Sequence, residues 1–163
     1  MDNKKFLIIA GILFTLHNVE EAIGFLNFKY PALPSFNFSP PAPLVMVTAI
    51  CIVTIVAWCL IFYANTFSSE NFRRNLLLVL STVFIFNALF PHISASILLK
   101  RYFPALFTSI FLYIPFSVWI LPRIYRSFQH KKMFFQTAIL GLMAAGGITV
   151  LIQFISKLII NKG

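Results

Sequence analysis

Apolar residues fill five long runs of this chain, and short polar or basic stretches separate them. The runs cover about residues 6–28, 43–63, 75–99, 103–122 and 133–160. A transmembrane helix needs roughly 20 consecutive apolar residues, so runs of this length can cross a bilayer. The pattern predicts an all-α integral membrane helical bundle of about five transmembrane helices, with residues 1–163 forming a single transmembrane domain.

The composition agrees with this pattern. Of the 163 residues, 60% are hydrophobic, 17% are aromatic and only 10% are charged, which excludes an ordinary soluble domain. The first run follows Lys4 and Lys5, as a signal peptide would, but it is too long and no small-residue cleavage site follows promptly. We therefore expect this run to be the first helix of a multi-pass protein of the cell membrane.

Basic residues between the runs predict the orientation, because cytoplasmic loops near helix ends retain Lys and Arg. Eight fall on one side, namely Lys4, Lys5, Arg73, Arg74, Arg123, Arg126, Lys131 and Lys132. Four fall on the other side, namely Lys29, Lys100, Arg101 and Lys162. The asymmetry predicts a cytoplasmic N-terminus. The net charge of +9 is then explained by the basic residues that orient the helices in the membrane. We expect membrane lipids as partners and no nucleic acid.

One histidine and two glutamates lie inside the first run, in the segment His17-Asn18-Val19-Glu20-Glu21. Each ionisable side chain near the centre of a bilayer costs about 3 kcal/mol, so this cluster requires a compensating role. On a helix, His17 shares a face with Glu20 (i, i+3) and with Glu21 (i, i+4). The two glutamates diverge by about 100°, so one ion is not expected to bind both directly.

A second polar pair lies in the third run, where Asn87 and His92 flank Pro91. Pro91 has no N–H to donate to the carbonyl of Asn87, which predicts a kink. With a rise of about 1.5 Å per residue, His17 and Asn87 lie roughly 18–20 Å from the inner ends of their helices. The two polar sites are therefore expected in one layer of the outer half of the bilayer. For Asn87, hydrogen bonding between neighbouring helices is an equal alternative.

These residues resemble the HXXEE domain proteins, a family named for the motif that stands here as His17 to Glu21. The resemblance continues through Asn87 and His92 to the segment Arg101-Tyr102-Phe103-Pro104-Ala105. Family members usually have Pro-Gly where this chain has Pro104-Ala105, which leaves open any special backbone role of that position. The resemblance implies a small multi-spanning membrane protein and does not supply a reaction.

The two carboxylates need a counter-charge, and no Lys or Arg lies in the same stretch of any run. Either one glutamate stays protonated, or a protonated histidine pairs with it, or a divalent cation is bound. Ligands with nitrogen and oxygen atoms suit zinc, iron or manganese. The candidate metal ligands are His17, Glu20, Glu21 and His92.

The first functional hypothesis is a membrane enzyme that acts on a small apolar or lipidic substrate. Two histidines and one glutamate would bind the metal, and the other glutamate would be the general base. The candidate catalytic residues are His17, Glu20, Glu21, Asn87 and His92. In a variant without metal, a Glu–His pair would move protons on an apolar substrate. The alternatives are a small proton- or cation-coupled transporter and, ranked lowest, polar residues that only fix helix packing.

Two further segments carry expectations about contacts. Gly141 and the run Ala144-Ala145-Gly146-Gly147 form a small-residue face suited to close helix contact, within the protomer or in a homo-oligomer. Five prolines between Tyr30 and Pro43 predict a stiff, non-helical connector across the outer mouth of the bundle.

Overall fold

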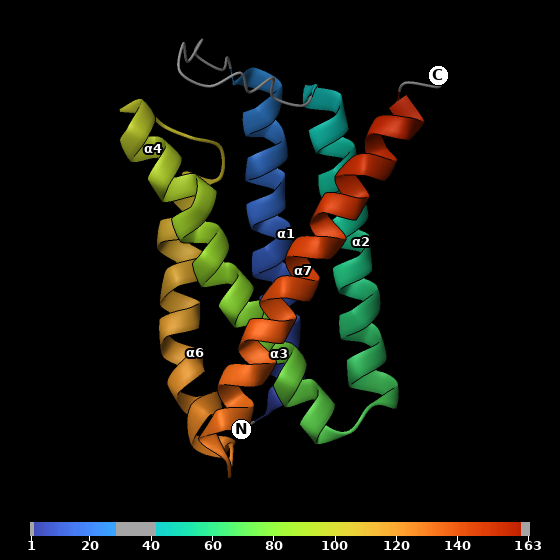
Figure 1. The fold of residues 1–163 in the computed structure, drawn as a ribbon, viewed down its shortest axis with the longest axis vertical. Coiled ribbons are helices and arrows are strands. Elements are labelled where there is room, and N and C mark those ends of the chain that lie inside the picture. Colours follow the sequence, from blue (N-terminus) through green and yellow to red (C-terminus); the bar gives the residue numbers. More distant parts are fainter. Residues whose placement is uncertain (1, 29–41, 161–163) are drawn as a thin grey trace.

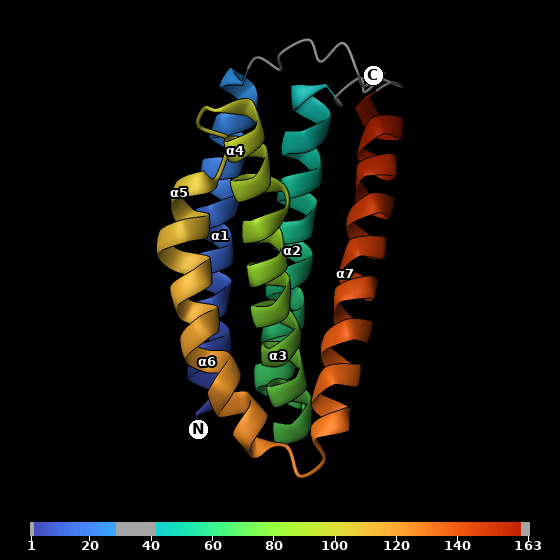
Figure 2. The same ribbon diagram turned by 60° about the vertical axis from the view of Figure 1, so that its left-hand side comes forward.

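Five long helical stretches lie alongside one another in the computed structural model, which describes residues 2–28 and 42–160 (Figures 1 and 2). The stretches long and apolar enough to cross a membrane are Asn3–Asn27, Pro43–Phe67, Glu70–Leu99, Leu106–Ser127 and Lys131–Ile160. The predicted all-helical bundle with five membrane-crossing helices is therefore confirmed. The first of these stretches begins at one end of the bundle, and the last stretch ends at the opposite end (Figure 1).

Three of the stretches are single helices, namely α1 (Asn3–Asn27), α2 (Pro43–Phe67) and α7 (Lys131–Ile160). The third stretch consists of α3 (Glu70–Asn87), the π-helix η1 (Ala88–Ile93) and α4 (Ser94–Leu99). The fourth consists of α5 (Leu106–Thr108), the π-helix η2 (Ser109–Tyr113) and α6 (Ile114–Ser127).

Several helices extend beyond the predicted apolar runs. An apolar run shows which part of a helix fits the bilayer, whereas capping residues determine where the helix begins and ends. α3 begins at Glu70 rather than near residue 75, since the side chain of Ser69 accepts a hydrogen bond from the N–H of Phe72 at 3.3 Å. α1 begins at Asn3 for the same reason, because Asp2 accepts from the N–H of Lys5 at 3.3 Å.

The third stretch bends at Pro91, as its sequence predicts. Phe90 has φ −131° and ψ 113°, which is an extended rather than a helical conformation. The bend lies between Asn87 and His92, whose side chains would point about 140° apart on a straight helix. Across the bend, Nδ2 of Asn87 lies 3.3 Å from Nε2 of His92. The kink therefore brings both side chains to the same place.

After α4 the chain turns back toward the middle of the bundle, through residues 100–108, which we call the returning segment (yellow in Figure 2). Lys100 ends α4 with φ 49°, and Ala105 precedes α5 with φ 60° and ψ 18°. Both are left-handed conformations, which favour glycine. The Pro104-Ala105 position therefore does have a special backbone role, and here an alanine adopts it. Ala105 is fully buried, as is Pro104.

At the end of the bundle that holds the N-terminus, polar side chains join α1, α3 and α6. Asn3 donates a hydrogen bond to Glu70, and Arg74 donates to the carbonyl of Ser127 at 3.2 Å. The basic residues assigned to one side of the membrane thus share this end. The cytoplasmic location of this end stays a prediction. The proline-rich connector lies outside the described residues.

Helix α7 crosses the bundle diagonally and is its most exposed helix (Figure 1). A Cβ at Gly141 would collide with the side chain of Val79, so this glycine permits the close contact between α7 and α3. A Cβ at Gly146 or Gly147 would meet nothing within 4 Å. Of the small residues of α7, Gly141 thus lies in a helix contact within the protomer, and Gly146 and Gly147 do not. The homo-oligomer stays a prediction.

Candidate functional site

His17 lies at the centre of the polar site, on the face of α1 that is turned toward the third and fourth stretches. Its side chain is fully buried, as is that of His92. Nδ2 of Asn87 lies 3.0 Å from Nε2 of His17 and 3.3 Å from Nε2 of His92. The centroids of the two imidazole rings are 4.8 Å apart. The structure therefore brings together the polar residues of the first and third runs.

Hydrogen bonds fix which ring nitrogen of His92 carries the proton. Nδ1 of His92 lies 2.6 Å from the carbonyl oxygen of Pro104. A carbonyl oxygen can only accept, so Nδ1 carries the hydrogen. In the neutral ring Nε2 then carries the lone pair, which accepts from the amide N–H of Asn87 at 3.3 Å.

The same reasoning applies to His17. Its Nδ1 lies 2.9 Å from Oγ1 of Thr108, and that hydroxyl donates to the carbonyl of Ala105 at 3.3 Å. The amide nitrogen of Asn87, which can only donate, lies 3.0 Å from Nε2, so Nε2 accepts and Nδ1 of His17 is the donor to Thr108. Both imidazoles therefore present unprotonated Nε2 atoms to the same small volume.

Glu21 completes this group. Its Oε1 lies 3.8 Å from Nε2 of His92, and the side chain is 16% exposed. One potential ligand atom from each of His17, Glu21 and His92 lies within 4.8 Å of the others. Among the ion pairs of the described residues, none joins Glu21 to a lysine or arginine. A carboxylate oxygen and an imidazole nitrogen thus face each other, and a proton or a cation between them would be bound by both.

Glu20 points elsewhere, although it is next to Glu21 in the sequence. Its carboxylate accepts hydrogen bonds from the hydroxyl of Tyr102, from the N–H of Phe107 at 3.1 Å and from the N–H of Thr108 at 2.8 Å. All three donors belong to the returning segment. Glu20 is accordingly not one of the three residues whose ligand atoms converge.

The remaining motif positions face away from the site. Nδ2 of Asn18 donates to Oγ1 of Thr54 at 2.6 Å, which joins α1 to α2. The side chain of Val19 is 51% exposed, on the outer surface of the bundle. The two variable positions of the motif therefore serve packing between helices and the apolar surface.

Sequence reasoning did not assign Thr108 and Pro104 to the site, and it considered Tyr113 only as one of several aromatic residues that could line a pocket. The ring of Tyr113 stacks on His17 with centroids 4.1 Å apart and on Phe84 with centroids 3.9 Å apart, which holds the imidazole plane. A threonine in an apolar run carries no signal of its own, because it usually bonds its own helix. The carbonyl of Pro104 carries none either, since backbone direction depends on the fold.

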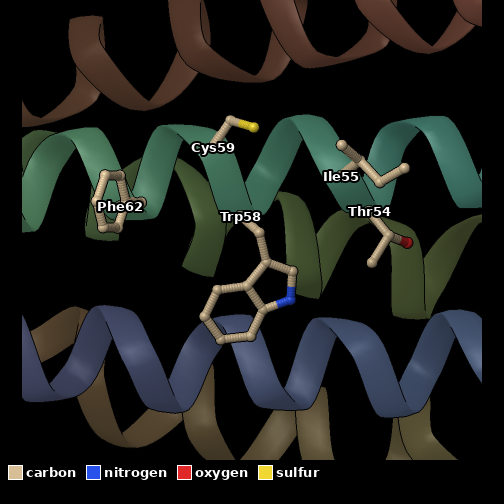
Figure 3. A pocket seen from close by; sticks show the side chains of 5 residues that line it. All are labelled: Thr54, Ile55, Trp58, Cys59 and Phe62. Atoms are coloured by element: carbon tan, nitrogen blue, oxygen red, sulfur yellow. The ribbon is translucent and has the colours of Figure 1, made fainter.

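An open groove of about 450 Å³ lies on the outer face of α2 (Figure 3). It is lined by Thr54, Ile55, Trp58, Cys59 and Phe62. Trp58 points from α2 toward α1, where its Nε1 donates to Oγ1 of Thr15 at 2.9 Å, and Cys59 points to the opposite side (Figure 3). None of these residues belongs to the histidine site, so the groove is a feature of the apolar surface.

Fold and site together define a helical membrane bundle that carries a buried histidine, asparagine and glutamate cluster. The chain belongs to the family described as "Protein of unknown function with HXXEE motif", which matches residues 8–120 and so includes every residue of the cluster. It is similar to the uncharacterized protein YrkK of Bacillus subtilis (strain 168), with 24% identity over 149 residues and 86% of each chain covered. No solved structure matches the chain.

Proposed function

We propose that this protein is a multi-pass metalloenzyme of the cell membrane, in which His17, His92 and Glu21 hold one divalent ion such as zinc, iron or manganese. The observation that carries the proposal is the convergence of one potential ligand atom from each of His17, His92 and Glu21 within 4.8 Å. A bound cation would satisfy the carboxylate and would replace the amide of Asn87 as the partner of the two Nε2 atoms.

The hydrogen bonds around the histidines support a metal. Metal-ligating imidazoles almost always donate their other N–H to a carbonyl, a carboxylate or water, which fixes the tautomer and the ring orientation. Here the Nδ1 atom of His92 donates to the carbonyl of Pro104 at 2.6 Å, and that of His17 donates to Thr108 at 2.9 Å.

The ligand set favours a catalytic site over a structural one. Structural zinc sites use four protein ligands, whereas catalytic sites use three, including the set of two histidines and one glutamate, and leave one position open. An ion so held would activate water or polarise a carbonyl group of the substrate. Asn87 now donates to both imidazoles. If the two rings bound an ion instead, its amide would be released and would be available to hydrogen-bond a substrate oxygen.

The depth of the site indicates a substrate that comes from the membrane. Glu21 lies six residues before Asn27, the last residue of α1, which is about 9 Å along the helix axis. His92 lies a similar number of residues before Leu99, the last residue of α4. The site is thus below one end of the bundle and surrounded by apolar helices. A substrate of this site would therefore be a small apolar or lipidic molecule that enters from the bilayer.

Metal content of the purified protein tests the proposal. After incubation with zinc, iron or manganese and removal of excess, we expect about one ion per chain in the wild type and little in His17→Ala, His92→Ala and Glu21→Gln. The matched control is His130→Ala, because this third histidine is exposed in the loop before α7 and should leave the metal content unchanged. A folded wild type without metal, or an equal loss in the control, refutes the proposal.

The alternative is a small proton- or cation-coupled transporter that uses the same cluster. The partial exposure of Glu21 favours it, because an exposed carboxylate can exchange protons with its surroundings. The two functions separate in liposomes. A metal-free protein whose proton or cation flux is lost in Glu21→Gln supports transport, whereas bound metal without flux supports the enzyme.

A further inference from the structure

The two glutamates of the motif differ in what surrounds them, and this difference separates their roles. We infer that Glu20 is a positioning residue, which anchors the returning segment and through it orients both imidazoles, and that it is not the general base. The effect of Glu20 on metal binding rests on the proposed function, whereas its effect on the orientation of the imidazole rings does not depend on a metal.

The carboxylate of Glu20 is occupied by donors. Oε1 accepts from the hydroxyl of Tyr102 and from the N–H of Phe107, and Oε2 accepts from the N–H of Thr108. A general base must offer a lone pair to the proton that it removes, within about 3.2 Å or through one water. Glu20 directs its oxygens to the returning segment instead of the imidazoles.

Two of these donors also lie at the N-terminal end of a helix, next to the carboxyl group of Glu20. Phe107 and Thr108 lie in the first turn of the Leu106–Ser127 stretch, where backbone N–H groups have no partner within the helix. The positive end of the helix dipole favours a carboxylate at this place. The protein itself thus supplies hydrogen-bond donors to the carboxyl group of Glu20, whereas Glu21 has no such donors among the described residues.

The segment that Glu20 anchors is the one that orients the histidines. Thr108 donates its backbone N–H to Glu20 and accepts the Nδ1 hydrogen of His17 on its hydroxyl. Pro104, two residues beyond Tyr102, provides the carbonyl that accepts from His92. Both Nδ1 acceptors therefore lie within the seven residues from Tyr102 to Thr108, which contact Glu20 at each end.

Removal of the anchor should loosen the site without removing a ligand. In Glu20→Gln the side chain keeps its size, but its NH2 group cannot accept a hydrogen bond, so the N–H of Phe107 or that of Thr108 loses its partner. Loss of an outer hydrogen-bond partner commonly lowers metal affinity 10–100-fold. We therefore expect Co²⁺, used as a coloured probe, to bind Glu20→Gln roughly 10–100-fold more weakly with an altered visible spectrum, and to bind Glu21→Gln more weakly still.

Three variants separate positioning from a general loss of fold. Thr108→Val removes the acceptor for His17 and should reproduce the effect of Glu20→Gln, whereas Thr108→Ser keeps the hydroxyl and should restore binding. Tyr102→Phe leaves both backbone N–H groups on Glu20 and should weaken binding less than Glu20→Gln does.

The histidine tautomers provide a measurement that needs no metal. Nitrogen-15 NMR of labelled histidine should show the Nδ1–H form for both buried rings of the wild type, and a mixture of tautomers for His17 in Glu20→Gln and in Thr108→Val. If the wild type binds no Co²⁺, the proposed function fails while the tautomer result still decides the inference. Unchanged tautomers and Co²⁺ spectrum in Glu20→Gln would overturn it.

Discussion

The contact between Gly24 of α1 and Pro104 of the returning segment gives the sharpest mutational test of the site. A Cβ at Gly24 would lie 2.6 Å from Cβ of Pro104 and 3.0 Å from its Cα. Carbon atoms in contact are normally about 3.5–4.0 Å apart, so in Gly24→Ala the proline must retreat by about 1 Å. Forced overpacking of this kind costs about 1–3 kcal/mol.

The retreat of Pro104 also moves the carbonyl that accepts from His92. That bond is now 2.6 Å long, and a displacement of about 1 Å in the unfavourable direction takes it beyond 3.5 Å, where it no longer counts as a hydrogen bond. Gly24→Ala should thus weaken Co²⁺ binding although it touches no ligand. Alanine in a helix interior gains about 0.5–1 kcal/mol over glycine, so the net loss of stability is about 0–2.5 kcal/mol.

Gly146→Ala is the matched control, because a Cβ there meets nothing within 4 Å. It gains the same helix preference without the collision, so the difference between the two variants isolates the contact with Pro104. Thermal unfolding in detergent, followed by circular dichroism, should place Gly24→Ala below the control by about 1–3 kcal/mol. Equal stability of the two variants, with unchanged Co²⁺ affinity in Gly24→Ala, would refute the packing argument.

Two further substitutions test other parts of the molecule. Ala105→Gly should raise the free energy of unfolding by about 0.5–1 kcal/mol. A left-handed alanine costs about 1–2 kcal/mol, and part of this gain is lost because glycine makes the unfolded chain more flexible. A variant that is less stable in thermal unfolding would contradict the φ of 60°. Asn18→Ala should lower stability by about 0.6 kcal/mol, the average for a hydrogen bond between membrane helices, and should leave the metal content unchanged. Loss of metal in this variant would place Asn18 in the site.

The helices could be predicted from the sequence because hydrophobic length is a local property. Each run of about 20 apolar residues has few stable structures in a membrane other than a helix that crosses it. The bend at Pro91 was also predictable, since proline removes one backbone donor wherever it occurs. The exact helix ends were not, because polar caps such as Ser69 extend a helix beyond its apolar part.

The proximity of His17, Asn87 and His92 was predictable from the sequence, and the hydrogen bonds that join them to the rest of the bundle were not. The depth of His17 and Asn87 along their helices indicated a shared layer, and the structure brings these residues together with His92. The sequence could not distinguish Glu20 from Glu21, because each shares a helix face with His17. What separates them is the return of the chain after α4, which depends on left-handed residues that hydrophobicity does not reveal.

The returning segment has a consequence for communication with the surroundings of the bundle. Tyr102 is 54% exposed, and two residues later the chain is fully buried at Pro104. The same short strip of chain therefore touches the environment at one point and holds an imidazole at the next. A ligand or an antibody that binds at this turn, or a proteolytic cut there, would therefore change the environment of the buried imidazole rings directly, without a movement of any helix.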